Sequence, residues 1–180
     1  MLERLLSEMK ANKKAGMVCP QLVYADGTLQ ISFKKIMTLK SKCFKWLALF
    51  STIFKRLSQK EECYTTTNRA LYPDYCISAC WLVRKEVFKK VGNFDEKIFY
   101  APEDADFCLR VWLGCFYVEY FPEASALHHT QRLSYRNRMI AISHLRGLLY
   151  FFGKYGLWWG RSAIYQKIST SIHIKYPLNH

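Results

Sequence analysis

The spacing of apolar residues predicts a helix followed by a β-hairpin at the start of the chain. Residues 1–14 have apolar positions at the period of one helical face. The residues on that face are Leu2, Leu5, Leu6 and Met9. Residues 17–24 form a strand-like segment that Pro20 interrupts, which predicts an edge strand or a bulge. The Asp-Gly pair that follows is a strong hairpin signal, so residues 28–33 are expected to return as the second strand.

Further along, apolar runs and breaker residues predict strands and helices in alternation. Residues 75–83 are almost continuously apolar, as in a central strand that is buried on both faces. A short helix over 84–91 should end at Gly92. The later elements are predicted as strands at 116–121 and 124–127 and a long helix at about 135–155.

Three carboxylates stand close together just after a proline, in Ala-Pro-Glu-Asp-Ala-Asp at residues 101–106. Pro102 suits the first position of a helix, and acids in the first turn are favoured by the helix dipole. We therefore expect a helix over 102–113 whose N-terminus presents Glu103, Asp104 and Asp106 and whose body is buried. Taken alone, the acids fit simple helix capping as well as a reactive site.

Residues 34–62 form a basic segment with an aromatic and aliphatic centre. Phe44, Leu47, Phe54 and other apolar residues are expected to share one helix face, with lysines at both ends. The apolar centre is too short to cross a bilayer. Two interpretations stay open: a helix that lies in a membrane interface, and a helix packed on its own domain with solvated lysines.

Composition and charge narrow the class of partner without choosing one. The chain has 180 residues, of which 51% are apolar, and a net charge of +13. This is enough for one domain with a core. The charge favours a polyanionic partner such as nucleic acid, an anionic membrane face or a phosphorylated ligand. The N-terminus is charged throughout and is not expected to be a signal peptide.

The seven cysteines do not have the spacing of a zinc site. No Cys-x-x-Cys pair occurs, and several cysteines lie in apolar runs, as buried thiols do. The odd count and these positions favour a reducing compartment.

A linked set of motifs in residues 75–129 resembles the second half of family 2 glycosyltransferases, particularly their rhamnosyl- and galactosyltransferase-like branch. In order, the motifs are Arg-x-x-x-Phe-x-x-Val-Gly-x-Phe-Asp-Glu, then Glu-Asp-x-Asp-x-Cys-x-Arg, then Pro-x-Ala-x-x-x-His-His. The resemblance extends more loosely back to Met1 and implies an α/β fold, namely an incomplete GT-A (nucleotide-diphospho-sugar transferase) mixed sheet with flanking helices. It assigns residues 1–130 to the acceptor-side part of this domain and 131–180 to a basic, aromatic, helical C-terminal extension.

The resemblance also implies a reaction, the inverting transfer of one sugar from a nucleotide sugar to a saccharide or lipid-linked acceptor in cell-surface polysaccharide synthesis. The Glu-Asp pair supplies the general base in that family, which carries over to Glu103 and Asp104, with Asp104 as the base. Neighbouring acids should raise the pKa of Asp104 toward a useful range. Asp106 is expected to hold Arg110 at i, i+4, or else to contact substrate.

Further residues carry over to substrate and metal. Ser78 and Ala79 stand where the family has a small pair that lines the acceptor site, and His128 matches a metal–diphosphate histidine, with His129 as the alternate. A histidine pair that only caps a loop is the competing interpretation. Arg132 (and Arg136) would meet a diphosphate or lipid phosphate, unless they are solvated. A divalent metal, Mg²⁺ or Mn²⁺, is expected for the complete family enzyme but not as a tightly bound group here.

The sequence departs from the family in one important respect. No Asp-x-Asp donor motif stands ahead of the acceptor half, so the chain is expected to be a truncated product or half of a split enzyme. A partner chain would then carry the donor half. The alternatives are an inactive remnant or partner subunit and a small basic nucleic-acid-binding protein, which only the charge supports. The resemblance places the protein in the cytoplasm, peripheral at the inner face of the membrane.

Overall fold

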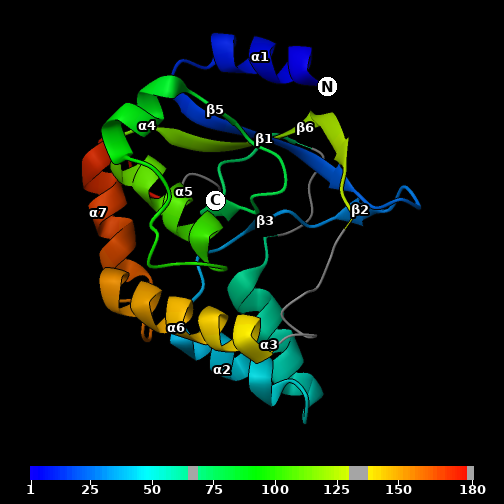
Figure 1. Cartoon of the computed structure of the whole chain (residues 1–180), viewed down its shortest axis with the longest axis vertical. Coiled ribbons are helices and arrows are strands. Elements are labelled where there is room, and N and C mark those ends of the chain that lie inside the picture. Colours follow the sequence, from blue (N-terminus) through cyan, green and yellow to red (C-terminus); the bar gives the residue numbers. More distant parts are fainter. Residues whose placement is uncertain (65–68, 130–137, 178–180) are drawn as a thin grey trace.

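A four-stranded mixed sheet forms the centre of the computed structural model (Figure 1). Strand β1 pairs in antiparallel orientation with β2 and β5 and in parallel orientation with β6. A separate antiparallel pair joins β3 and β4. The strands are β1 (Ala15–Val23), β2 (Leu29–Gln30), β3 (Phe33–Lys34), β4 (Tyr75–Cys76), β5 (Leu82–Val83) and β6 (Tyr117–Leu127). This mixed α/β architecture confirms the expected fold class and is compatible with an incomplete GT-A-like fold.

Seven helices surround the sheet in the part of the chain that the structure describes, residues 1–64, 69–129 and 138–177. They are α1 (Leu2–Ala11), α2 (Leu39–Leu47), α3 (Thr52–Glu62), α4 (Lys85–Val91), α5 (Glu103–Leu113), α6 (Arg138–Tyr155) and α7 (Ser162–Ile172). None of these described helices is both long enough and apolar enough to cross a membrane.

The sheet is buried on both faces by helices. On one face, Leu5 and Met9 of α1 pack against Val18 of β1 in a small cluster. On the other, Met17 and Cys19 belong to the main core, which also holds α5. Alternate side chains of a strand point to opposite faces, so β1 contributes to both clusters. Figure 1 shows the resulting layers, with α1 and α5 on opposite sides of the sheet.

The C-terminal helices share the main core with the sheet. Phe151 and Phe152 of α6 and Ile164 and Ile168 of α7 are buried in the same cluster as the body of α5. The predicted boundary near residue 130, between an acceptor-side domain and a C-terminal extension, stays a prediction.

A buried carboxylate ties α7 to the strand pair. Asp74, which is fully buried, accepts hydrogen bonds from the hydroxyls of Tyr64 (2.7 Å), Tyr165 (2.5 Å) and Tyr176 (2.8 Å). It also accepts one from the backbone N–H of Ile36 at 2.6 Å. Four donors compensate the cost of burying this charge, so Asp74 holds together segments that are far apart in sequence.

A hairpin follows β1 as predicted, but its second strand is shorter, because β2 ends at Gln30 and Phe33 belongs to β3. The place of β1 in the sheet also differs. The register of β1 against β6 shifts between Pro20 and Gln21, and the extra residues, 122–124, lie in β6. Pro20 does not lie on an edge strand, because β1 has partners on both sides. The irregularity beside Pro20 is therefore in the partner strand β6 and not in β1.

Two other predicted elements divide in the structure. Residues 34–62 form a hairpin of α2 and α3 in place of one helix, and the single predicted strand over 75–83 becomes β4 and β5 with a turn between them. Ser78 and Ala79 lie in that turn and are exposed. Of residues 75–83 only Tyr75 and Cys76 are buried, so the apolar run overstated burial and did not reveal that the chain turns within it.

Candidate active site

The first turn of α5 carries the predicted carboxylates. Pro102 is the N-cap of α5, so the helix begins at Glu103, one residue later than predicted. Glu103, Asp104 and Asp106 lie in its first turn. The body of the helix is buried, including Phe107 and the residues around it. The acids are therefore held at a fixed helix end, where the dipole favours negative charge.

Glu103 meets the turn between β4 and β5. The hydroxyl of Ser78 donates to Oε1 of Glu103 at 3.0 Å, and Ala79 is exposed beside it. The structure thus brings together two predicted site residues that are 25 positions apart. Both belong to surfaces that a ligand can reach, because Glu103 is only partly buried and Ser78 is exposed.

Asp104 has an unusual electrostatic environment. Its Oδ1 accepts a hydrogen bond from the backbone N–H of Ala105 at 2.7 Å. Burial of the carboxyl group, together with the neighbouring Glu103 carboxylate, raises the pKa of Asp104 to about 7. That hydrogen bond and the positive charges of Lys34 and Lys42 act in the opposite direction. Near neutral pH the group therefore exchanges its proton readily, as a general base must.

The expected contribution of the neighbouring acids is present only in part. Glu103 raises the pKa of Asp104 as predicted, but burial is the larger cause. Burial is the main cause that raises the pKa of Tyr75, and the negative charge of Asp104 is the second. Asp104 and Tyr75 therefore share one partly desolvated environment at the end of α5.

Asp106 faces the opposite way, into the protein. It accepts hydrogen bonds from Arg110 (2.8 Å), Lys154 (2.7 Å) and Tyr155 (2.8 Å) and is fully buried. The pairing with Arg110 is the expected i, i+4 contact. Its substrate-binding role stays a prediction, and these partners favour a structural role in joining α5 to α6.

The Phe-Asp-Glu turn is fixed to α6 by the same lysine. Asp95 accepts a backbone N–H from Lys97 at 3.1 Å, as a turn residue does, and it also accepts from Lys154 (2.7 Å) and Tyr150 (3.0 Å). The hydrogen bond from Lys154 is the largest cause that lowers the pKa of Asp95. Sequence reasoning did not identify Lys154, although its i, i+4 spacing from Tyr150 on α6 was visible.

The two histidines lie at the end of β6. Nδ1 of His128 is 2.9 Å from Oε1 of Gln30, and His129 is exposed. Arg132 and Arg136 lie outside the described residues. Among the described residues no group of three or more His, Cys, Asp or Glu side chains is placed to hold a metal ion. The side chains described here do not form a metal site by themselves, so the metal and the role of His128 stay predictions.

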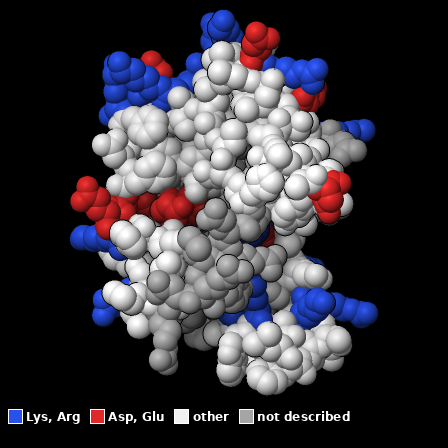
Figure 2. All heavy atoms as spheres, turned by 45° about the vertical axis from the view of Figure 1, so that its right-hand side comes forward, with Lys and Arg blue, Asp and Glu red and all other residues white. Residues whose placement is uncertain are grey.

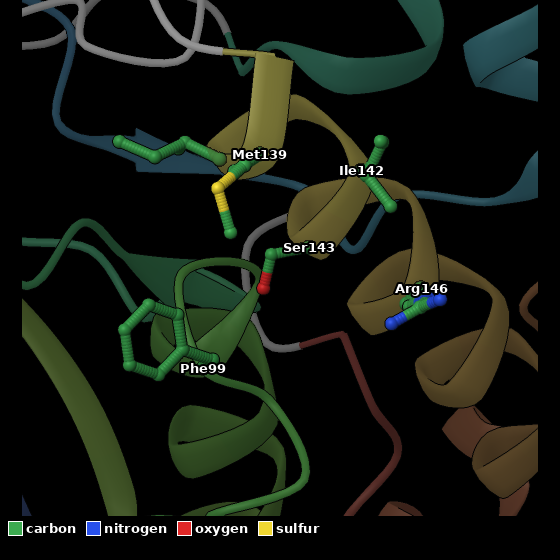
Figure 3. Close-up of a pocket in the computed structure, with 6 residues that line it drawn as sticks. Phe99, Met139, Ile142, Ser143 and Arg146 are labelled. Carbon is green, nitrogen blue, oxygen red and sulfur yellow. The ribbon is translucent and has the colours of Figure 1, made fainter.

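A pocket of about 530 Å³ lies between α6 and the loop that leads into α5 (Figure 3). It is lined by Phe99, Met139, Ile140, Ile142, Ser143 and Arg146. In Figure 3 Met139 and Ser143 point from α6 toward the space beside Phe99. The lining combines apolar surface with one guanidinium group, which suits an apolar ligand that carries an anion.

The close approach of α6 to this loop depends on a glycine. A Cβ atom at Gly147 would lie 2.4 Å from the carbonyl oxygen of Ala101, so a larger residue would push the helix away. Sequence reasoning did not identify the pocket, because its two walls lie about forty residues apart and only the helical pattern of α6 was visible.

Comparison with known proteins identifies two similar bacterial rhamnosyltransferases. Over 83 residues, 45% of this chain, it is 31% identical to N-acetylglucosaminyl-diphospho-decaprenol L-rhamnosyltransferase of Mycobacterium tuberculosis. Over 70 residues, 39% of this chain, it is 36% identical to rhamnosyltransferase WbbL of Escherichia coli. No protein-family model matches the chain.

The matches cover 27% of the mycobacterial protein and 25% of the E. coli protein, so the chain spans about a quarter of the length of these relatives. Similarity of this degree to two rhamnosyltransferases agrees with the motif resemblance in residues 75–129. The comparisons thus support a likeness of this chain to part of a family 2 glycosyltransferase.

Proposed function

We propose that this chain forms the acceptor side of an inverting glycosyltransferase, with Asp104 as general base. The observation that carries the proposal is the pKa of Asp104, which burial and Glu103 raise to about 7 in the partly buried first turn of α5. A carboxylate with the usual pKa would be a weaker base, because catalysis by proton transfer is most effective when the pKa is near the working pH.

In the proposed reaction, Asp104 accepts the proton of an acceptor hydroxyl as the hydroxyl oxygen attacks the anomeric carbon of the donor sugar. The new C–O bond forms while the bond from that carbon to the nucleoside diphosphate breaks, which inverts the anomeric centre. The transition state resembles an oxocarbenium ion. Glu103, held by Ser78 at 3.0 Å, is placed to orient the acceptor hydroxyl beside Asp104.

We propose that the donor diphosphate and its metal bind mainly to a donor-binding part, supplied by a longer form of the protein or by a partner chain. A divalent cation there would stabilise the leaving diphosphate. His128, the predicted metal ligand, lies at the end of β6 and forms a hydrogen bond with Gln30. No step of the proposal depends on a metal held by this chain.

The acceptor in the proposed reaction is lipid-linked, which places the enzyme in the cytoplasm at the inner face of the membrane. The name of the mycobacterial relative describes transfer to N-acetylglucosaminyl-diphospho-decaprenol. The pocket beside Phe99 and Arg146 supports an acceptor of this kind, since it offers apolar surface next to a cation.

A transfer assay tests the proposal. The purified chain is incubated with N-acetylglucosaminyl-diphospho-decaprenol and a panel of nucleotide-activated sugars that includes activated L-rhamnose. The assay is run with the chain alone and with membranes and cytosol of a source strain that lacks the gene, so that a donor-binding part can contribute. We expect a product one sugar larger, detected by mass spectrometry, that depends on the chain.

Two results would separate this proposal from its alternatives. If the chain binds the acceptor but no condition gives chain-dependent transfer, the chain is an inactive remnant or a binding subunit. Transfer by the chain alone would show that no separate donor-binding part is needed, and Asp104 would then act in a self-sufficient enzyme.

A further inference from the structure

The hairpin of α2 and α3 ends in an uncovered apolar tip. We call Trp46, Leu49, Phe50 and Ile53 the hairpin tip. These side chains are 64%, 76%, 76% and 68% exposed, respectively. Trp46 contacts Phe50 with ring centroids 5.8 Å apart, so the tip is an organised aromatic surface. Large apolar residues grouped in this way on a surface indicate an interaction site.

The other end of the hairpin is firmly attached to the protein. Thr38 and Ser41 form a capping box at the start of α2, and Ser41 also donates to the buried Glu62 at the end of α3. Arg161 reaches Glu61 at 2.9 Å and the carbonyl of Ile36 at 2.5 Å. The hairpin is therefore fixed at its base, and the tip projects from the end of the molecule opposite α1 (Figure 1).

Basic side chains surround the tip. Between residues 40 and 60 the sequence has six Lys or Arg residues and no Asp or Glu. Lys45, Lys55 and Arg56 are exposed close to the tip. Figure 2 shows the same arrangement, with an uncharged lower end and blue side chains just above it. An apolar tip with a cationic surround complements an anionic lipid surface, in which acyl chains lie beneath charged headgroups.

The neighbouring helix places the pocket at this end of the protein. Positive charges on Lys42 and Lys45 of α2 lower the pKa of His144 on α6, after burial, so the two helices lie close together. The outward side chains of α6 include Met139 (80% exposed) and Ile142 (54% exposed), which also line the pocket. A membrane contacted by the tip would therefore lie near the pocket.

We propose that the hairpin tip inserts into the headgroup region of an anionic phospholipid membrane and that Lys45, Lys55 and Arg56 bind the anionic headgroups around it. This inference rests on the proposed function and deepens it, because it names the surface that would keep the pocket close to a lipid-linked acceptor in the membrane. It does not depend on catalysis, because vesicle binding requires no sugar donor and no acceptor. Lys40 and Lys42 pair with Glu61 and Glu62 at the base of the hairpin. Within the described part of the chain, Lys45, Lys55 and Arg56 near the tip form no salt bridge, and an anionic membrane would neutralise them.

Co-sedimentation of the full chain with vesicles tests this surface. The vesicles contain equimolar phosphatidylcholine and phosphatidylglycerol, with pure phosphatidylcholine vesicles as the uncharged comparison. We expect binding to the anionic vesicles that weakens with added salt. The double variant Leu49→Glu/Phe50→Glu should bind at least about tenfold more weakly, because charged residues are poorly accommodated below the headgroups.

A matched control separates the tip from net charge. Leu2→Glu/Leu6→Glu changes two exposed apolar residues of α1 at the opposite end of the molecule and adds the same negative charge. It should bind nearly as well as the unmodified chain. Equal weakening by both variants would overturn the proposal, since charge alone would then explain the loss.

Two further measurements test insertion itself. Lipids brominated on the acyl chain should quench the fluorescence of the chain, and Trp46→Phe should remove most of that quenching. Lys45→Gln/Lys55→Gln should weaken binding to anionic vesicles several-fold more than Lys10→Gln/Lys13→Gln does. If the chain forms a dimer that Leu49→Glu/Phe50→Glu converts to a monomer, with no vesicle binding by either, the tip contacts a second copy and the proposal is wrong.

The outcomes also distinguish this inference from the proposed function. Unchanged vesicle binding by the tip variant, with transfer intact, contradicts membrane insertion only. Strong vesicle binding with no transfer under any condition contradicts the catalytic proposal only.

Discussion

Two carboxylates of the same helix, two residues apart, have opposite environments. Asp106 is fully buried and accepts hydrogen bonds from Arg110, Lys154 and Tyr155. Asp104 has a single backbone N–H at 2.7 Å and the like charge of Glu103 beside it, so its pKa rises to about 7. The hydrogen bonds of the fold compensate the negative charge of Asp106, whereas ionising Asp104 costs free energy.

The difference separates a structural acid from a chemical one. A buried carboxylate that accepts hydrogen bonds from three side chains contributes to stability through those bonds. A carboxylate with a raised pKa costs stability when it is ionised but is better able to accept a proton. The motif Glu-Asp-x-Asp alone does not distinguish the two, because two of the donors to Asp106, Lys154 and Tyr155, come from the distant helix α6.

The largest effect is expected from Asp104→Asn in the transfer assay. The amide keeps the shape of the side chain but cannot take the acceptor proton, so the rate of transfer should fall by about 10²- to 10⁴-fold. Acceptor binding and the circular dichroism spectrum should be nearly unchanged. Glu103→Gln is the matched neighbouring change and should cost less, since it alters orientation and not proton transfer.

Retained turnover in Asp104→Asn would show that another group is the base. If Glu103→Gln abolished transfer and Asp104→Asn did not, the roles of the two acids would be exchanged.

For Asp106→Ala the expected loss is in folding. The change leaves Arg110 and Lys154 partly buried without their shared acceptor, so the free energy of unfolding should fall by about 3 to 5 kcal/mol. Urea denaturation of the purified chain measures it. Glu96→Ala, at an exposed position of the preceding turn, is the control and should cost less than about 0.5 kcal/mol. A small loss in Asp106→Ala would mean that the cluster is not structural.

A smaller effect, opposite in sign, is expected for the stability of Asp104→Asn. The folded-state pKa of Asp104, about 7, lies above its ordinary value of 3.8, so the folded state binds the proton more tightly than the unfolded state. Stability from this group is therefore greatest at low pH and is lost as the pH rises toward 7. Asparagine does not ionise, so the free energy of unfolding of the variant should rise relative to that of the unmodified chain as the pH increases.

Thermal unfolding at about pH 5 and about pH 8 measures this difference. The difference in melting temperature, variant minus unmodified chain, should be about 2 to 4 °C larger at the higher pH than at the lower pH. An equal shift at both pH values would show that Asp104 is not a group with a raised pKa. The contrast with Asp106, which costs stability when removed, would then disappear.

Sequence reasoning predicted the helix of residues 102–113 well, because proline, acids and a buried apolar body all indicated the same element. It also predicted the pair of Asp106 with Arg110, since that is a local contact. The motif resemblance gave the family, which the similarity to two rhamnosyltransferases supports.

Contacts between distant segments were not predictable in the same way. The apolar run at 75–83 was assigned to one strand, although a turn inside it delivers Ser78 to Glu103. Lys154 and the four donors to Asp74 were missed, because no local pattern says which tyrosine or lysine will meet a given carboxylate. The two-helix form of residues 34–62 was missed too, since one helical period runs through both halves.

Ser78→Ala is expected to have the smallest effect, and it tests a residue that only the family resemblance assigned to the acceptor site. The change removes the hydroxyl that donates to Glu103 at 3.0 Å at an exposed site. Because such a bond contributes about 1 kcal/mol or less, transfer should fall only about two- to fivefold. If Ser78 orients the acceptor through Glu103, the loss should appear mainly as a higher KM for the acceptor, and Ser78→Thr should restore most of it. A loss in kcat with an unchanged KM would instead assign Ser78 to the environment of Asp104, which would make the exposed side of α5 a single proton-transfer unit and not a base with a separate acceptor contact.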